Sequence, residues 1–152
     1  MNLITINRFN TIALAQKRVT LMKHILTILG YLLVSFGVQG LSHFVINQDH
    51  YAAVSYARPD PVVPMGLSAM VLQGLILSIA LGKLAPAGAT IRDGLKVSWA
   101  FGLFLVSYIA IAEPAKYQVP SIAQWIAVEA SAGLLQFTLV GLLIGLIHQK
   151  LR

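Results

Sequence analysis

The chain alternates four long apolar stretches with short polar segments. Each stretch is long enough to cross a bilayer, which takes about 20 helical residues at roughly 1.5 Å per residue. The stretches lack the polar outer face that a helix of a water-soluble bundle requires. The sequence therefore predicts four transmembrane helices, approximately at residues 25–46, 64–82, 97–112 and 121–147.

The third stretch is the shortest, because Lys96 and Glu113 bracket only 16 uncharged residues. A lysine at a helix end can extend its ammonium group to the membrane surface while its aliphatic stem stays in the apolar region. We therefore expect this helix to begin about one turn before Val97.

The connecting segments are unequal, and the longest, residues 47–63, is predicted to be the main external loop. Within it, Asp49 to Tyr56 is compatible with a short helix at the membrane interface, where tyrosines are favoured. Pro64 then suits the first turn of the second helix. Because the connections are short, neighbouring helices should be antiparallel, which predicts an all-α, four-helix membrane bundle.

Composition supports the same class. Hydrophobic residues make up 57% of the chain and charged residues 11%, against about 25% charged in an average soluble domain. Such a composition excludes an intrinsically disordered chain, which would be poor in apolar residues. The absence of cysteine excludes disulfide scaffolds, thiol nucleophiles and cysteine-ligated metal centres.

The net charge of +6 is distributed unevenly between the two sides that four spans create. One side holds Arg8, Lys17, Arg18, Lys23, Lys83, Arg92, Lys96, Lys150 and Arg152, and the other holds Arg58 and Lys116. Positive residues concentrate on the cytoplasmic side of membrane proteins, so both termini are predicted to be cytoplasmic and the protein to lie in the inner membrane. The basic residues are dispersed and have no aromatic platform beside them, which favours anionic lipid headgroups over nucleic acid as their partner.

Residues 1–21 precede the four-span domain, which we place at residues 22–152. Three interpretations of this segment remain open: an amphipathic helix on the inner surface, a disordered leader, or an upstream extension of a protein that starts at Met22. A cleaved signal peptide does not fit, because the apolar run after Lys23 continues for the length of a full span and no small-residue cleavage site closes it.

The second and fourth spans share a pattern. Gln73 is followed by Ser78 and Gly82, and Gln136 by Gly141 and Gly145, at the same offsets. This correspondence suggests a parallel duplication of two helical hairpins, of the kind known among transporters. The small residues at four-residue spacing also form stripes on which another helix can pack, either within the chain or from a membrane-protein partner or second copy.

Polar residues inside the spans are the candidates for function, because burying them in a membrane is costly. Glu129 is an acidic residue deep in an apolar run, roughly 12 Å below the outer surface at 1.5 Å per residue. Each of the other spans places a polar group at a comparable depth. The predicted cluster in the outer half of the bundle consists of Gln39, His43, Gln73, Tyr108 and Glu129.

Three roles for this cluster remain open: an interhelical hydrogen-bond network, a cavity that binds a ligand or proton, and a catalytic site. His43 and Glu129 would make an acid–base pair, but the sequence identifies no nucleophile. We expect Glu129 to find neutral partners such as Gln39, Gln73 or His43, since burial favours the protonated carboxyl.

Cofactor and metal sites have little support. His43, Asp49 and His50 are close in sequence but lack a recognised ligand spacing. His24 and His148 are both predicted near the inner surface, a position that is commonplace for histidines and needs no haem between them. We therefore predict no metal and no cofactor, and assign no catalytic residue.

The expected function is that of a small non-enzymatic membrane protein, either an accessory subunit or a binding or transport module. The alternative is a membrane enzyme that acts on a lipid or isoprenoid-like substrate through His43 and Glu129. The position of Glu129 separates these hypotheses. A carboxyl that faces an interior cavity favours binding or proton-coupled transport, whereas small-residue stripes that face lipid favour assembly with a partner.

Overall fold

The computed structural model describes residues 3–55, 58 and 60–151, with side chains described from residue 10 onward. Tyr56, Arg152 and the side chain of Arg8, which entered the predictions above, lie outside the described residues. The described residues form helices and connecting loops without a strand. The elements are α1 (Leu3–Leu41), η1 (Ser42–Ile46), α2 (Gln48–Ala52), α3 (Val63–Leu84), α4 (Ile91–Ser107), η2 (Tyr108–Ala112) and α5 (Ile122–Lys150).

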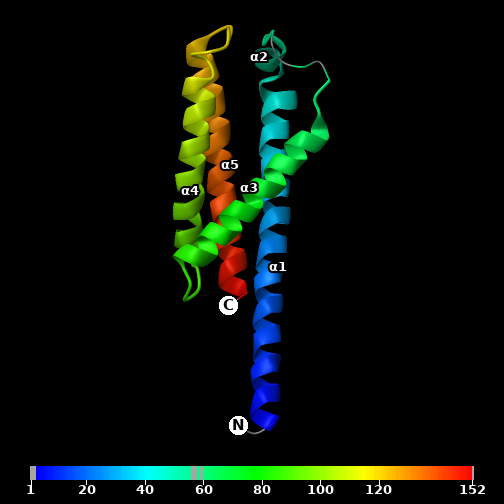
Figure 1. Ribbon diagram of the computed structural model, residues 1–152. Coiled ribbons are helices and arrows are strands. Elements are labelled where there is room, and N and C mark those ends of the chain that lie inside the picture. The colour runs from blue at the N-terminus through cyan, green and yellow to red at the C-terminus, as the bar shows by residue number, and fades with distance from the viewer. Residues whose placement is uncertain (1–2, 56–57, 59, 152) are drawn as a thin grey trace.

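Four helices are long and apolar enough to cross a membrane, which confirms the predicted number of candidate spans. Consecutive long helices run antiparallel, and the start of α1 and the end of α5 both lie at the lower end of the bundle in Figure 1. We call this the lower end, and the end that carries α2 the upper end. The five-residue segments η1 and η2 are π-helical turns that end α1 and α4 at the upper end.

The third long helix, α4, begins at Ile91. This start lies before Val97, as the sequence predicted. The cause is a capping box at its N-terminus. The Thr90 hydroxyl accepts a hydrogen bond from the Asp93 amide (3.2 Å), and the Asp93 carboxylate accepts one from the Thr90 amide (3.0 Å). Because this arrangement satisfies two of the free amides of the first turn, it fixes the helix start before Lys96.

Helix α1 continues through most of residues 1–21. Residues 3–21 are helical and continuous with the rest of α1, and the first candidate span covers Asn10–Ile46, so α1 extends below the rest of the bundle (Figure 1). The described side chains of this extension are mostly exposed, with Ile12 and Leu14 at 63% and 60%.

Helices α4 and α5 form the closest pair in the bundle. A Cβ atom built on Gly145 would lie 2.6 Å from the Cα of Ile91, and one on Gly141 would lie 2.9 Å from the Cα of Leu95. Real Cβ atoms do not approach a backbone this closely, so glycine is what allows these two backbones to touch. The glycine stripe of the fourth span therefore packs a helix of the same chain, rather than facing outward to a partner.

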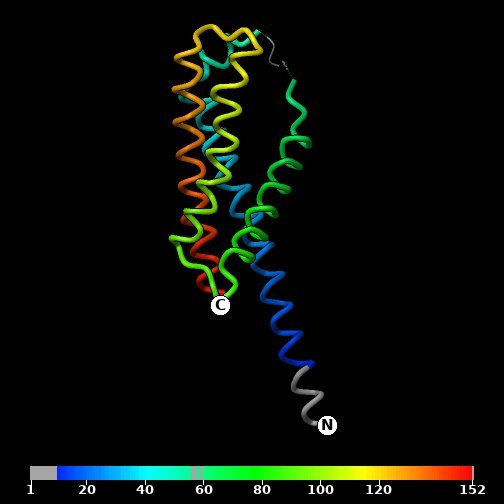
Figure 2. The backbone as a smooth tube through the Cα atoms, turned by 60° about the vertical axis from the view of Figure 1, so that its left-hand side comes forward, coloured from blue at the N-terminus to red at the C-terminus, as the bar shows by residue number. Residues whose placement is uncertain are grey.

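Helix α1 packs against both α3 and α5, while α3 makes few contacts with α4. The stripe on α3 is used at Gly74, where an added Cβ would lie 3.0 Å from the Cα of Ile28 on α1. Figure 2 shows that α3 is close to α4 at the lower end and leans away from it toward the upper end.

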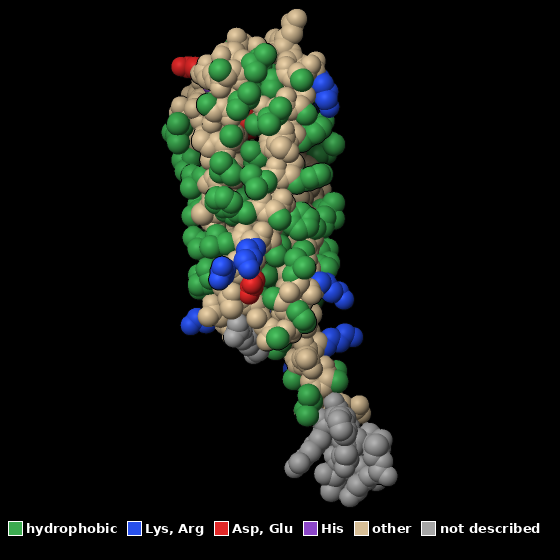
Figure 3. Space-filling model, turned by 90° about the vertical axis from the view of Figure 1, so that its left-hand side faces the viewer, with side chains coloured by type: hydrophobic (Ala, Val, Ile, Leu, Met, Phe, Trp, Pro, Cys, Tyr) green, Lys and Arg blue, Asp and Glu red, His purple; other side chains and the backbone are tan. Residues whose placement is uncertain are grey.

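Large apolar side chains are exposed on the outside of the bundle, and several polar side chains are buried inside it. Leu33 and Phe104 are 75% and 79% exposed, whereas Ser35 and Ser98 are at most 1% exposed. The face shown in Figure 3 carries hydrophobic side chains along its length, and Lys and Arg side chains gather near the lower end. This is the arrangement expected of helices surrounded by lipid, whose polar groups must find partners within the bundle.

The predicted short helix of the upper loop is present as α2, which covers Gln48–Ala52 and so ends earlier than the predicted Tyr56. Its Tyr51 makes contacts within the chain that the sequence did not predict. The side chain is half-buried and turned toward α5, where it contributes to the site described next.

Candidate binding site

A cavity of about 690 Å³ opens in the upper half of the bundle, between α1, α3, η2 and α5, with α2 over one side. It lies where α3 leans away from α4. We call it the upper cavity. Its polar and aromatic lining consists of Tyr31, Ser35, Gln39, His43, Phe44, Tyr51, Arg58, Gln73, Glu113, Trp125, Glu129 and Gln136. Four of the five candidate residues, all except Tyr108, therefore line one cavity.

Glu129 is 8% exposed and faces this cavity. Its Oε1 accepts a hydrogen bond from the Tyr51 hydroxyl at 2.7 Å. The partners expected from the sequence, Gln39, Gln73 and His43, bond to other groups. The reason is that α2 folds over the upper end of the bundle and brings a tyrosine, which the sequence analysis had placed at the membrane surface, within reach of α5.

The partner of Glu129 is held by aromatic packing. The Tyr51 ring stacks on the His43 ring with 3.7 Å between centroids and 13° between planes. It also meets the Trp125 ring edge-on at 6.4 Å. Burial and the hydrogen bond to Glu129 raise the pKa of Tyr51 well above its ordinary value, so its hydroxyl remains a proton donor.

His43 is fixed in one tautomer. Its Nδ1 lies 2.9 Å from the backbone carbonyl oxygen of Gln39. A carbonyl oxygen can only accept, so Nδ1 carries the proton and Nε2 of the neutral ring keeps its lone pair. Tyr51 contacts both residues of the expected acid–base pair, because its ring stacks on His43 and its hydroxyl donates to Glu129.

Below this group, a network of amides joins three helices. Gln136 on α5 accepts a hydrogen bond from the Gln39 amide at 2.6 Å and donates one to the Ser35 hydroxyl at 2.9 Å. The Tyr31 hydroxyl donates to Gln73 on α3 at 2.8 Å. Each polar side chain of α1 in this region thus has a partner on a neighbouring helix, as an interhelical network requires.

A second carboxyl belongs to the cavity. Glu113 follows η2 and is partly buried at the upper end. Burial raises its pKa, and the nearby negative charge of Glu129 raises it further. Arg58 is the cationic group among the described lining residues.

Tyr108 is not part of the site. It is 48% exposed, and its hydroxyl accepts a hydrogen bond from the Lys116 ammonium at 3.0 Å. Leu105 and Ile109 take the cavity-facing positions of this segment, which leaves Tyr108 on a neighbouring face. The sequence pattern did not predict the rotation of this segment about its axis.

The predicted cluster did not include Tyr31, Tyr51, Glu113, Trp125 and Gln136, all of which line the cavity. A signal existed for Gln136, since it corresponds to Gln73 in the repeated pattern of the second and fourth spans. Tyr31 lies four residues before Ser35 and eight before Gln39, so it continues the polar face of α1 by one more turn. For Tyr51, the sequence held no sign that its loop folds inward.

No group of three or more histidines or carboxylates with metal-binding geometry occurs in the parts of the chain that the structure describes. Of the two histidines near the lower end, His24 and His148, both contact the hydroxyl of Ser78, which lies between them.

Comparison with protein-family models, with curated proteins and with solved structures gave no match. The function is therefore argued from the geometry of the site.

Proposed function

We propose that this chain is a four-span protein of the inner membrane, with both termini in the cytoplasm, whose upper cavity binds a small lipophilic cation from the external side. The membrane assignment is supported by four long apolar helices whose polar side chains are buried and whose large apolar side chains are exposed. The orientation is supported by the concentration of Lys and Arg at the lower end. The shared positions of Gln73 and Gln136 in one cavity support a duplicated hairpin.

The observation that carries the binding function is the position of Glu129. It is buried from lipid, it faces an open cavity, and its partner is a neutral hydroxyl rather than a cation. An intramembrane carboxyl without a cationic partner is a site where a proton or a cationic ligand can bind. By contrast, Gly74, Gly141 and Gly145 of the small-residue stripes pack helices within the chain, which weakens the hypothesis of an accessory subunit assembled through them. Gly82 of α3 is open, because an added Cβ would meet no atom within 4 Å.

The lining of the cavity favours a cation over an anion. Two carboxyl groups, Glu113 and Glu129, face it, against the single guanidinium of Arg58. The rings of Tyr51 and Trp125 offer aromatic surfaces, which attract cations through their quadrupoles. A ligand with a positive charge and an apolar body would thus satisfy both kinds of wall.

The cavity does not continue to the lower end. Along α3, Leu77 lies between Gln73 of the upper cavity and Ser78 further down, and it is 2% exposed. Tyr31 of α1, whose hydroxyl bonds to Gln73, is 1% exposed. A transport cycle would require these side chains to move, so binding is the function that this conformation supports directly.

The proposal is tested with a pair of probes of the same shape and opposite charge, tetraphenylphosphonium and tetraphenylborate. Binding to the purified protein in detergent is measured by calorimetry. We expect the cation to bind better than the anion, and Glu129→Gln to weaken cation binding about tenfold or more, because a charged interaction is removed.

Tyr108→Phe is the matched control, since it removes a polar group at the same depth but outside the cavity. Equal binding of the two probes, or an equal loss in the control, would refute a cation site at Glu129.

An enzymatic function through His43 and Glu129 is the second candidate. It is favoured by the tautomer of His43, whose Nε2 is available as a base at the cavity wall. Against it, the direct partner of Glu129 is Tyr51. Turnover of an added isoprenoid alcohol or phospholipid by the wild-type protein, lost in His43→Asn while cation binding persists, would establish the enzyme instead.

A further inference from the structure

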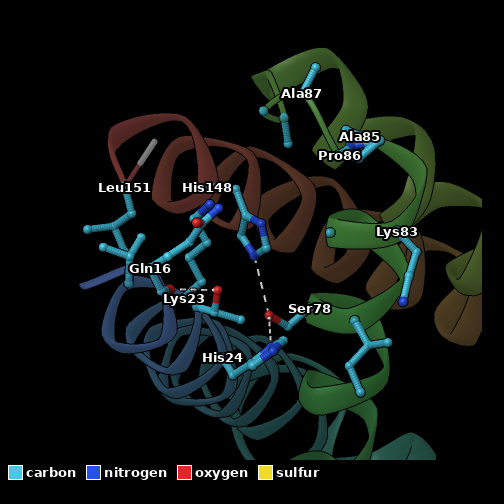
Figure 4. Close-up of a pocket in the computed structure, with 16 residues that line it drawn as sticks. Gln16, Lys23, His24, Ser78, Lys83, Ala85, Pro86, Ala87, His148 and Leu151 are labelled. Carbon is cyan, nitrogen blue, oxygen red and sulfur yellow. Dashed lines mark hydrogen bonds between the residues drawn. The ribbon is translucent and has the colours of Figure 1, made fainter. Parts of the chain in front are cut away.

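A second cavity, of about 630 Å³, lies at the lower end between α1, α3, the loop after α3 and the end of α5. Figure 4 shows it. We call it the lower cavity. It shares no lining residue with the upper cavity, and the function proposed above does not use it.

The floor of the lower cavity is a hydrogen-bonded group from three helices. The Ser78 hydroxyl on α3 lies 2.8 Å from Nδ1 of His24 on α1 and 3.3 Å from Nε2 of His148 on α5. Thr27 on α1 also contacts Nε2 of His148, at 3.3 Å. In Figure 4 the two imidazole rings point toward each other with the serine oxygen between them. These bonds hold α1, α3 and α5 in a fixed relation around the cavity.

The walls carry positive charge and hydrogen-bond donors. Lys23, which is half-buried, and Gln16 line the cavity from α1. Lys83 lies at the rim on α3 and does not point toward the histidines (Figure 4). Among the described lining residues there is no carboxylate. The charge of this lining is opposite in sign to that of the two carboxyls in the upper cavity, and it would repel a cation.

We propose that the lower cavity binds a phosphate group. Lys23 supplies a positive charge, and the side chains of Gln16 and His24 offer N–H groups that can donate hydrogen bonds to phosphate oxygens. Such charge-assisted hydrogen bonds are about twice as strong as neutral ones. A lysine that served only to set the orientation of the protein would need neither a cavity nor partial burial.

The remaining lining indicates which phosphate compounds fit best. Val19, Ile79 and Leu151 add apolar surface to the cavity, and Ile79 is 44% exposed on the outside of α3. A phospholipid with an unsubstituted phosphate can place its phosphate beside Lys23 and its glycerol and acyl chains along this surface. A free phosphate ion would use the polar part of the site alone.

The test uses the full-length protein in detergent and four probes: dioleoyl phosphatidic acid, dioleoyl phosphatidylglycerol, dioleoyl phosphatidylcholine and inorganic phosphate. Dissociation constants are measured by lipid titration in native mass spectrometry, and phosphate is added as a competitor. We expect phosphatidic acid to bind more tightly than phosphatidylglycerol, and phosphatidylcholine to bind weakest. Competition by inorganic phosphate would assign the site to the phosphate group alone, and failure to compete would assign it to the lipid.

Three variants locate the site. Lys23→Gln should weaken binding of phosphatidic acid about tenfold or more, and Lys23→Arg should retain it. Lys96→Gln, which removes an exposed charge at the same end but outside the cavity, should leave the affinity unchanged. Glu129→Gln should also leave it unchanged, so the result is independent of the upper cavity. Equal affinity for all three lipids, or an equal loss in Lys23→Gln and Lys96→Gln, would overturn the proposal.

Discussion

The two cavities are built largely by the same helices, yet their chemistry is opposite. Helix α1 supplies Ser35 and Gln39 to the upper cavity and Lys23 and His24 to the lower one. The upper cavity adds two carboxyls and several aromatic rings, and the lower cavity adds a second lysine and a second histidine. One helix therefore contributes to two kinds of site, and Tyr31, which is nearly inaccessible, is at the lower limit of the α1 residues that line the upper cavity.

The difference follows from which elements cover each end. At the upper end, α2 folds inward and places Tyr51 against Glu129, so an acidic group is held by a neutral donor. At the lower end, the helices end near the basic segments that set the predicted orientation, and the histidines are held by a hydroxyl. Both sites depend on α3, which leans away from α4 while α4 and α5 stay closely packed.

The largest expected effect comes from disturbing the α4–α5 pair that both sites use as a fixed support. A leucine at Gly145 would place atoms within 2.6 Å of the Ile91 backbone, so the helices would have to separate. We expect Gly145→Leu to lower the free energy of unfolding by about 3 kcal/mol or more, at the upper end of overpacking costs. Unfolding in mixed micelles by denaturing detergent measures it.

Gly37→Ala is the control for that experiment, because an added Cβ on Gly37 meets no atom within 4 Å. Alanine is the better helix former by about 0.5–1 kcal/mol, so this variant should be as stable as the parent or more so. If Gly145→Leu unfolds no more easily than Gly37→Ala, the close approach of α4 and α5 is not what holds the bundle.

The second-largest expected effect on stability comes from substituting Glu129 in the upper cavity. Glu129→Gln keeps an oxygen that can accept the Tyr51 hydroxyl, and we expect its stability to be nearly unchanged. Glu129→Leu leaves that hydroxyl without its partner and should cost about 1–3 kcal/mol. Thermal unfolding of the two purified variants, compared under one condition, makes the measurement. A leucine variant as stable as the parent would show that the carboxyl has no structural role, which would strengthen the case for ligand binding.

How much of this site the sequence could predict is clear from Glu129 and Tyr108. Depth follows from counting residues along a helix, so the cluster of Gln39, His43, Gln73 and Glu129 at one level was predicted. Rotation about the helix axis depends on packing against neighbours, so the outward position of Tyr108 was not. The spans themselves were predictable because a membrane requires long apolar helices.

The partner of Glu129 was not predictable for a different reason. It comes from α2, a five-residue helix in a loop, whose position depends on stacking against His43 and on contact with Trp125. Loop positions of this kind are set by tertiary contacts, and the local sequence pattern does not contain them. The sequence also left the conformation of residues 1–21 open, because they lack a continuous apolar run, and residues 3–21 are helical.

A smaller effect is expected at the lower cavity. Ser78→Ala removes the hydroxyl that joins His24 to His148, but Thr27 still contacts His148. His148 keeps Thr27 as a partner when the Ser78 hydroxyl is lost. We therefore expect the free energy of unfolding to fall by about 1 kcal/mol, less than in Glu129→Leu. The same unfolding assay compares them. A larger loss in Ser78→Ala than in Glu129→Leu would reverse the order of importance assigned to the two ends.

The smallest effect sharpens the electrostatic part of the comparison. Burial and the charge of Glu129 raise the pKa of Glu113 in the folded protein. The stabilising effect of its proton is therefore complete below the ordinary pKa of a glutamate and is lost as pH rises through the raised value. Glu129→Gln removes the second cause and leaves the first, so the pKa of Glu113 should fall without reaching its ordinary value.

Carbon-13 NMR of labelled glutamate carboxyls measures this pKa, with Glu113→Gln used to assign the signal. Lys116, which lowers the pKa of Glu113, is unchanged in both proteins and serves as the common background. If the pKa of Glu113 is the same in Glu129→Gln and in the parent, the two carboxyls do not interact. The upper cavity would then lack the concentrated negative charge that distinguishes it from the lower one, and a cationic ligand would lose its main electrostatic support.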